Sequence, residues 1–249
     1  MSPHKSSKKS KLKIALWVLS GLLIFIFFAG WIYLRINTYK ADEVALKNLV
    51  SSQDIKITQS SSLIAFENVK KESELGFIVY PGGLVEPQAY SSLCRRISEN
   101  FDQCFIPSMP LNFAILSPNK AEEIIKAHPE ITQWTIIAHS LGGPAATRFI
   151  QSHPDVIKNL VLLGSYSDVD ISNAQTKVLS LLGSQDGLVD LEVYKTSQAN
   201  LPSDTVFETI LGANHGQMGD YGPQKGDGEP KISAAAQKEA ILQAIKNDF

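Results

Sequence analysis

An uncharged run of 21 residues, residues 14–34, restricts the fold of this chain more than any other feature. As a helix the run would span ~31 Å, close to the ~30 Å hydrocarbon core of a bilayer. Trp17 lies near its start, and Trp31 and Tyr33 lie near its end, where aromatic residues are enriched at membrane interfaces. The run therefore predicts a transmembrane helix, preceded by a basic tail of residues 1–13.

The charges on either side of this run indicate its orientation. Five lysines precede it, whereas only Arg35 and Lys40 follow closely. The positive-inside rule then places the N-terminus in the cytoplasm and the rest of the chain outside. A cleaved signal peptide is the alternative, but its apolar region usually has only about 7–15 residues and ends in a small-x-small site. The run is longer, and Phe28-Ala29-Gly30-Trp31 is a poor cleavage site, so we expect a permanent single-pass membrane anchor.

The composition beyond the anchor excludes one class of partner. All 25 acidic residues follow the run, whereas the whole chain holds 23 Lys and Arg. This acidic balance argues against a nucleic-acid partner, which needs a basic surface. Only two cysteines are present, which is too few for a disulfide scaffold. An exported domain can form a disulfide, but Cys94 falls on an expected helix and Cys104 on the next strand, so we favour two buried thiols.

Alternating apolar segments predict one domain over residues 51–249, joined to the anchor by a linker or short helix within residues 35–50. Strands are expected at residues 54–58, 63–68, 76–80, 103–106, 134–138, 160–163, 178–182 and 205–211. Helices are expected at residues 87–99, 121–127, 142–151, 189–197 and 234–245. After an opening hairpin, most strands alternate with helices, which predicts a mostly parallel sheet covered on both faces. The short polar segment after residue 163 leaves no room for a helical cap.

The segment Ala138-His139-Ser140-Leu141-Gly142-Gly143 joins an expected strand to an expected helix. This is the context of a nucleophile elbow, a strained turn that holds a serine hydroxyl above the edge of the sheet. Small residues are needed two positions before and after the serine, because neighbouring backbone passes close to it. Ala138 and Gly142 meet that need. The segment therefore predicts Ser140 as a nucleophile.

A serine hydroxyl is a poor nucleophile near neutral pH and needs a base within hydrogen-bonding reach. The chain order that accompanies such an elbow is nucleophile, acid and then histidine. His215 is the only histidine after the last expected strand. His128 and His153 each precede a proline at a helix end, and His139 is expected to point elsewhere on the elbow. We therefore expect His215 to be the base.

The acid that orients this base should follow the strand before it in the chain. Asp186 lies in the turn Gly183-Ser184-Gln185-Asp186-Gly187, directly after an expected strand. Asp190 is the nearest alternative, but it falls at the next helix. A carboxylate at Asp186 would accept the imidazole N–H, fix its tautomer and stabilise the imidazolium.

A tetrahedral intermediate needs two backbone N–H groups to stabilise its oxyanion. Leu141, directly after the nucleophile, should supply one of them. The other should come from the loop Pro81-Gly82-Gly83-Leu84-Val85, where glycines allow backbone to approach a substrate. Gly83 and Leu84 are both candidates. The loop at residues 216–230 is long and rich in Gly, Asp and Pro, and loops of that length are more often functional than idle.

Five stretches of the chain carry a resemblance to a known family. They are Tyr80-Pro81-Gly82-Gly83-Leu84-Val85, Pro107-Ser108-Met109-Pro110-Leu111-Asn112, His139-Ser140-Leu141-Gly142-Gly143, Asp186-Gly187-Leu188 and Asn214-His215-Gly216-Gln217. Together they resemble a compact, uncapped α/β-hydrolase subfamily that often carries an N-terminal anchor and is similar in build to dienelactone hydrolases. The similarity covers roughly residues 75–245, and the loop at residues 220–227 also looks like the family's substrate-cleft loop.

The resemblance implies the α/β-hydrolase fold and an uncapped serine hydrolase without a metal or organic cofactor. The expected reaction is cleavage of a small to medium carboxylic ester through an acyl-enzyme at Ser140. A same-fold amidase, thioesterase or acyltransferase would keep every residue named and remains an alternative. A non-catalytic binding module would normally have lost a member of the triad, and Ser140, Asp186 and His215 are all present.

Overall fold

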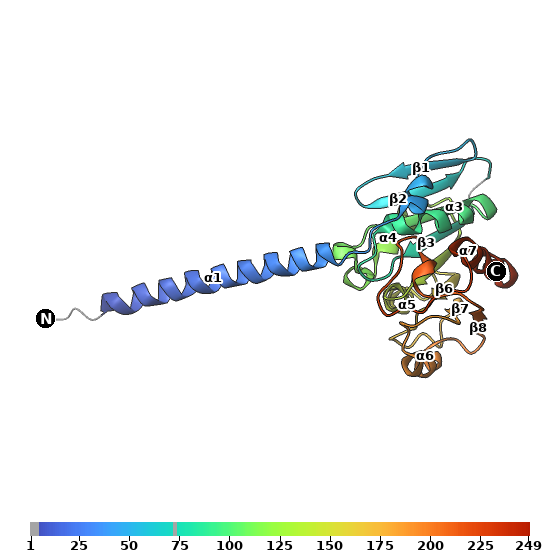
Figure 1. Ribbon diagram of the computed structural model, residues 1–249. Helices are drawn as coiled ribbons and strands as arrows, with labels where there is room; N and C mark the ends of the chain where they lie inside the picture. Colours follow the sequence, from blue (N-terminus) through green and yellow to red (C-terminus); the bar gives the residue numbers. More distant parts are fainter. Residues whose placement is uncertain (1–4, 72–73) are drawn as a thin grey trace. The chain divides into compact units, whose positions relative to one another are not determined.

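The computed structural model describes residues 5–71 and 74–249 and divides into two units, residues 1–38 and 39–249. The first unit holds one helix, α1 (Lys5–Ile36) (Figure 1). Its residues 11–36 are long and apolar enough to cross a membrane, and none of the window tested is buried within the protein. Membrane anchors and signal sequences both have these properties. The predicted span is therefore a helix of suitable length and composition.

Eight strands of the second unit form a single sheet with the order β1-β2-β4-β3-β5-β6-β7-β8. The strands are β1 (Ile55–Gln59), β2 (Leu63–Asn68), β3 (Leu75–Tyr80), β4 (Gln103–Pro107), β5 (Gln133–His139), β6 (Asn159–Leu163), β7 (Lys177–Gly183) and β8 (Val206–Ile210). β1 and β2 form an antiparallel hairpin, and β2 pairs antiparallel with β4. All other neighbours are parallel. The expected hairpin followed by a parallel sheet is confirmed.

Helices cover both faces of this sheet, as expected. The helices are α2 (Glu43–Lys47), α3 (Ser91–Asn100), α4 (Lys120–Ala127), α5 (Gly142–Ser152), α6 (Leu191–Ser197) and α7 (Ala234–Asp248). Short 3-10 turns are η1 (Pro87–Tyr90), η2 (Pro110–Asn112), η3 (Ala114–Leu116), η4 (Gln198–Asn200) and η5 (Gly216–Met218). Apolar residues of α3 and α7 share one buried core, and those of α4 and α5 share the other. Residues 164–176, between β6 and β7, contain no helix, so no cap is inserted there.

Side chains of the central strands alternate between the two cores. In β3, Phe77 and Val79 belong to the core beneath α3 and α7, whereas Ile78 and Tyr80 belong to the core beneath α4 and α5. A strand that is buried on both faces needs an apolar side chain at nearly every position. This is why these strands show continuous apolar runs in the sequence.

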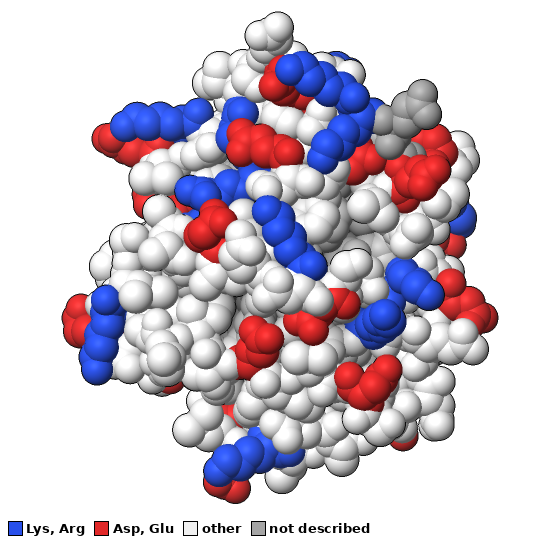
Figure 2. Space-filling view, turned by 90° about the vertical axis from the view of Figure 1, so that its right-hand side faces the viewer, with Lys and Arg blue, Asp and Glu red and all other residues white. Residues whose placement is uncertain are grey.

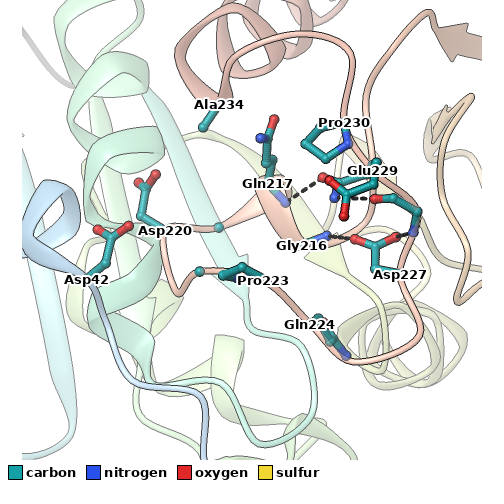
Figure 3. A pocket seen from close by; sticks show the side chains of 14 residues that line it. Asp42, Gly216, Gln217, Asp220, Pro223, Gln224, Asp227, Glu229, Pro230 and Ala234 are labelled. Atoms are coloured by element: carbon teal, nitrogen blue, oxygen red, sulfur yellow. Dashed lines mark hydrogen bonds between the residues drawn. The ribbon is translucent and has the colours of Figure 1, made fainter.

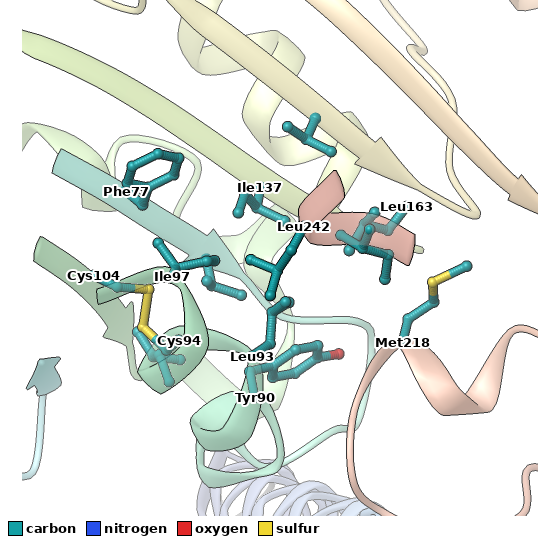
Figure 4. Close-up of a cluster of buried hydrophobic side chains, with 14 of the residues drawn as sticks. Phe77, Tyr90, Leu93, Cys94, Ile97, Cys104, Ile137, Leu163, Met218 and Leu242 are labelled. Carbon is teal, nitrogen blue, oxygen red and sulfur yellow. A yellow bond between two sulfur atoms is a disulfide. The ribbon is translucent and has the colours of Figure 1, made fainter. Parts of the chain in front are cut away.

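Cys94 of α3 and Cys104 of β4 form a disulfide within the first core (Figure 4). The expectation of two separate thiols is therefore wrong, although both residues are fully buried as expected. α3 packs directly on β4, which brings the two Cα atoms to 5.4 Å, within the range that a disulfide can bridge. That packing distance is a tertiary property and cannot be read from the spacing of the cysteines.

The predicted linker covers residues 35–50. Its later part, from residue 39 on, packs into the second unit. The Tyr39 N–H donates to the Leu84 carbonyl (2.7 Å), and the Tyr39 carbonyl accepts from the Glu86 N–H (3.0 Å). The Asn48 carbonyl, after α2, accepts from the Arg95 guanidinium (3.1 Å). Residues 39–48 therefore brace the loop after β3 and are not a free tether.

Charged side chains are interspersed on the face of the molecule shown in Figure 2, without an extended patch of either sign. Ion pairs of the second unit include Arg96 with Glu239 (3.2 Å) and Lys70 with Asp54 (2.7 Å). The face in view thus offers no uniformly basic surface of the kind that nucleic-acid binding requires.

Candidate active site

Ser140 occupies a strained turn between β5 and α5, with φ at 51°. A positive φ is uncommon for a residue with a side chain and is expected at a nucleophile elbow. The Ser140 N–H donates to the Leu163 carbonyl at the end of the adjacent β6 (3.1 Å). A Cβ on Gly142 would collide with the Tyr80 carbonyl oxygen of β3. Close backbone approach thus explains the glycine two positions after the serine.

His215 and Asp186 form a buried hydrogen-bonded pair at the same edge of the sheet. Nδ1 of His215 lies 2.8 Å from Oδ2 of Asp186, and the two side chains are 3% and 1% exposed. The other carboxylate oxygen accepts N–H groups of Leu188 (2.9 Å) and Val189 (3.0 Å), which holds the carboxylate in place. A neutral His215 must carry its proton on Nδ1 to donate this bond, so Nε2 is left as an acceptor.

Gly164, directly after β6, links the serine to this pair. It follows Leu163, whose carbonyl accepts the Ser140 N–H, and its φ is 50°. A Cβ there would lie 2.7 Å from Asp186 Oδ2 and 2.9 Å from His215 Nδ1. The pair therefore packs against the strand end next to Ser140, where only glycine leaves room. Gly164 was not among the residues predicted for the site, although a glycine directly after a buried strand is a signal that the sequence contains.

The His215 side chain is not hydrogen-bonded to Ser140 in this structure. Its Nε2 is buried and has no hydrogen-bond partner within residues 5–71 and 74–249. In unliganded enzymes such bonds are often long and tighten only when a substrate binds. Nε2 of His215 is thus not engaged by any other group among the described residues.

The remaining candidates from the sequence have structural partners. Asp190 caps α6, where Oδ1 accepts the N–H groups of Glu192 (2.9 Å) and Val193 (3.1 Å). His128 ends α4 and lies 3.0 Å from Glu130. His153 ends α5, where Nδ1 contacts the Phe149 carbonyl at 3.1 Å. None of these side chains joins the Ser140 edge of the sheet through a hydrogen bond in the described part of the chain.

The loop after β3 has one amide that is left free. The Gly82 N–H donates to the Tyr90 hydroxyl (2.8 Å), and the Leu84 N–H donates to the Asn112 carbonyl (2.8 Å). The Gly83 N–H donates to no group among the described residues. A Cβ on Gly83 would meet the Leu141 side chain. The loop therefore lies beside the residue that follows the nucleophile, with the Gly83 N–H available.

His139, expected to point elsewhere on the elbow, packs instead against His215, with ring centroids 4.5 Å apart. Strand alternation explains this position, because His139 follows Ile137 on the face of the sheet that also buries Met218 of η5. Burial, followed by the charge that His215 can carry, holds the pKa of His139 well below its ordinary value. His139 is therefore a neutral neighbour of the candidate base.

Asp227 fixes the loop that carries His215 (Figure 3). Its carboxylate accepts the N–H groups of His215 (3.3 Å) and Gly216 (2.7 Å), and also that of Gly187 (3.1 Å) beside Asp186. One side chain thus ties the turn after β7 to the loop after β8. A Gly- and Asp-rich loop was recognisable in the sequence, but the specific role of Asp227 was not.

The same loop, residues 216–230, borders a cavity of about 360 Å³ (Figure 3). Ser140, Asp186 and His215 do not line it. Two of its carboxylates already have partners, because Asp227 binds backbone N–H groups and Asp220 pairs with Lys238 (2.6 Å). The residues that the structure describes contain no group of three or more His, Cys, Asp or Glu that could hold a metal ion.

Comparison with known proteins supports the fold seen here. The alpha/beta hydrolase family matches residues 76–239, which is more than half of the chain. No curated protein matches it in sequence. The dienelactone hydrolase of Anabaena variabilis has a similar fold, with a TM-score of 0.61 and 12% identity over 79% of this chain and all of that one.

Two further solved structures have a similar fold. A CIB-like hydrolase from Thermoplasma acidophilum has a TM-score of 0.60 at 11% identity, over 78% of this chain and 99% of its own. Carboxylesterase CesB of Bacillus subtilis has a TM-score of 0.57 at 11% identity, over 83% and 96% of the two chains. At these identities the likeness concerns the fold. Together with the family match, the sheet order and the elbow, it leads to one conclusion: this chain belongs to the alpha/beta hydrolase family.

Proposed function

We propose that this protein is a serine hydrolase that cleaves carboxylic esters through Ser140, His215 and Asp186. One observation carries the proposal. The strained Ser140 turn hydrogen-bonds to Leu163 at the end of β6, and the buried Asp186–His215 pair packs against Gly164, the next residue. Membership of the alpha/beta hydrolase family supports hydrolase chemistry at that edge.

In the proposed reaction, His215 Nε2 takes the proton of Ser140 as Oγ attacks the ester carbonyl carbon. The carbonyl electron pair moves to oxygen, and the N–H groups of Gly83 and Leu141 stabilise the resulting oxyanion. The tetrahedral intermediate collapses as its bond to the leaving oxygen breaks and His215 returns the proton to the alcohol. Water then attacks the acyl-enzyme in the same way and releases the acid. Asp186 stabilises the imidazolium of His215 during both the acylation of Ser140 and the hydrolysis of the acyl-enzyme.

Gly83 is our choice for the second oxyanion donor. The neighbouring amides of Gly82 and Leu84 are already bonded to Tyr90 and Asn112. An amide that must first break a buried hydrogen bond is a poor donor to the oxyanion. The free energy lost with the broken bond would offset the free energy gained from the new one.

An ester of small to medium size suits the site best. The connection between β6 and β7 contains no helix that could cover it, and Leu141 beside the nucleophile is 42% exposed. Two proteins of similar fold, a carboxylesterase and a dienelactone hydrolase, are named for ester cleavage. An amidase, a thioesterase or an acyltransferase would use the same residues and differ in the lining of the site.

A fluorophosphonate probe tests this function, because it labels only an activated serine. We expect the wild-type protein to be labelled and to hydrolyse at least one of a panel of p-nitrophenyl esters of graded acyl length. His215→Ala should lower that turnover by several orders of magnitude, because Ser140 loses its base. His128→Ala is the matched control and should change turnover little, since His128 lies at the end of α4. An inactive His128→Ala protein beside an active His215→Ala protein would contradict the proposal.

We also propose that residues 14–34 are a permanent anchor, with residues 1–13 in the cytoplasm and the catalytic domain, residues 51–249, outside. The five lysines before the span, against only Arg35 and Lys40 closely after it, support this orientation. The buried Cys94–Cys104 disulfide adds independent support, since disulfides persist mainly in oxidising compartments.

Protease added to intact spheroplasts should therefore degrade the C-terminal domain while a tag at the N-terminus stays protected. Immunoblots against tags at the two ends, before and after lysis, measure this. A cytoplasmic marker that survives until lysis is the control. Protection of the C-terminal domain in intact spheroplasts would show that the orientation is wrong.

A further inference from the structure

Tyr90 of η1 connects the loop after β3 with the residue before the nucleophile. Its hydroxyl oxygen accepts the Gly82 N–H at 2.8 Å and lies 2.8 Å from Nδ1 of His139. Burial raises the pKa of Tyr90 above its ordinary value, so the phenol keeps its proton. Nδ1 of His139 is the only acceptor that the described residues offer to the buried Tyr90 O–H, so the O–H donates to it. That bond makes Nδ1 of His139 an acceptor and leaves its proton on Nε2.

His139 carries the contact from Tyr90 to the base. Its ring lies 4.5 Å from that of His215, centroid to centroid, and the two residues are only 1% and 2% exposed. The other titratable groups that face His139 are Tyr90 and Tyr221, whose ring centroids are 5.9 Å and 6.4 Å away. Both phenols have raised pKa values because they are buried, so neither supplies a charge.

A neutral His139 suits this position, because His215 must become an imidazolium during the proposed reaction. A positive charge 4.5 Å away would oppose that step. The Tyr90 hydroxyl stabilises the neutral ring of His139 by donating to Nδ1, the atom that would otherwise take up a proton. Asp186, bonded to Nδ1 of His215, is then the group that balances the imidazolium charge.

The loop packs closely on this pair of side chains. A Cβ on Gly82 would lie 2.9 Å from Nδ1 of His139 and 3.2 Å from the Tyr90 hydroxyl. Tyr90 thus draws the Gly82 N–H toward the interior, while the next amide, that of Gly83, remains free. The Tyr90 hydroxyl thereby bonds to the loop that carries Gly83 and to His139, which packs against the ring of His215.

We propose that Tyr90 and His139 are positioning residues that hold the Gly82–Gly83 loop and the ring of His215 in a fixed mutual geometry. The proposal rests on the proposed function, because it assigns these residues to the same reaction. Neither residue touches the reacting atoms in the mechanism above, so each acts through a neighbour.

Tyr90→Phe in the full-length, detergent-solubilised protein removes only the hydroxyl. Losing an oxyanion donor outright costs about 100–1,000-fold in kcat. A misplaced loop should cost less, so we expect a loss of about 10–100-fold in kcat. KM should stay within about 2-fold, since the misplaced groups act in the transition state.

Tyr194→Phe is the matched control, because it also removes a buried tyrosine hydroxyl, one that bonds Ser180 (2.9 Å) between α6 and β7. This variant should keep wild-type kcat, and thermal unfolding of both variants measures any common loss of stability. Equal losses of kcat in Tyr90→Phe and Tyr194→Phe, or no loss in a folded Tyr90→Phe protein, would overturn the proposal.

His139→Phe provides a second, independent variant, since it keeps an aromatic ring against His215 but cannot accept from Tyr90. Its loss of kcat should not exceed that of Tyr90→Phe, because it leaves the bond from Gly82 to Tyr90 intact. The double variant should be little worse than Tyr90→Phe alone, because Tyr90→Phe already removes the Tyr90–His139 bond. Losses that multiply in the double variant would show that the two residues act separately, which contradicts the proposal.

Nuclear magnetic resonance of ¹⁵N-histidine-labelled protein gives a readout that does not depend on activity. In the wild type, His139 should show a neutral ring protonated on Nε2 that does not titrate between about pH 5 and pH 8, the range of an ordinary histidine. In Tyr90→Phe the hydrogen-bond shift at Nδ1 should disappear. A wild-type His139 that titrates in this range, or that is protonated on Nδ1, would overturn the proposal. Absence of fluorophosphonate labelling in the wild type would instead count against the proposed function.

Discussion

Ser140→Ala should abolish fluorophosphonate labelling and lower ester turnover by roughly a millionfold, the loss seen when a serine protease loses its nucleophile. The methyl group of alanine cannot form the acyl-enzyme, and Asp186 and His215 matter to the chemistry only through Ser140. Adding His215→Ala or Asp186→Asn to Ser140→Ala should therefore lower the residual rate very little. Probe labelling and hydrolysis of the best p-nitrophenyl ester measure both effects.

The control for this series is Ser60→Ala, at the turn of the β1–β2 hairpin, far along the chain from the elbow. It should be labelled and active like the wild type. Circular dichroism should show Ser140→Ala folded, because the lost hydroxyl makes no hydrogen bond among the described residues and is not part of either apolar core. Strong labelling of a folded Ser140→Ala protein would place the nucleophile at another residue.

Lys238→Met should destabilise the unit of residues 39–249 by about 3–5 kcal/mol, the usual cost of leaving one member of a buried ion pair unpaired. Lys238 of α7 lies 2.6 Å from Asp220, and both side chains are 3% exposed. The Ser92 hydroxyl of α3 donates to the other carboxylate oxygen. Without the lysine, this carboxylate would stay buried with one hydroxyl as its only side-chain partner. Denaturant unfolding followed by circular dichroism gives the change in free energy of unfolding.

Two variants separate the ion pair from other effects of the substitution. Lys238→Met combined with Asp220→Asn should recover much of the stability, because replacing both charges can be nearly neutral. Lys195→Met removes a lysine whose pair with Glu192 is solvent-exposed (3.7 Å), and it should change stability little. Wild-type stability in Lys238→Met would show that the pair does not hold α7 against the loop of residues 216–230.

The order and type of the elements followed from local patterns along the chain. The apolar run of residues 14–34 allows little except a membrane-length helix, since length and composition alone decide this. The continuous apolar runs predicted the buried strands, because a strand covered on both faces has no solvent side. The Ser140 elbow also needs only consecutive residues, a strand before it and a helix after it.

The candidate base and acid needed one further piece of information, the chain order that accompanies such an elbow. With it, His215 and Asp186 could be selected by their positions after expected strands. In a parallel sheet the carboxyl ends of neighbouring strands share one edge. Asp186 and His215, which are 29 positions apart in the sequence, are therefore close enough to form a hydrogen bond.

Only the tertiary structure decided the features that depend on contacts between separate segments. The Cys94–Cys104 bond required the packing of α3 on β4. The bond from Leu84 to Asn112, which leaves the Gly83 N–H free, and the bond between Tyr90 and His139 also join segments that are separate in the chain. Sequence patterns record which residues are apolar, small or flexible, and these properties act within one element. Hydrogen-bond partners across the fold depend on how elements distant in the chain pack together. A local sequence pattern carries no information about that packing.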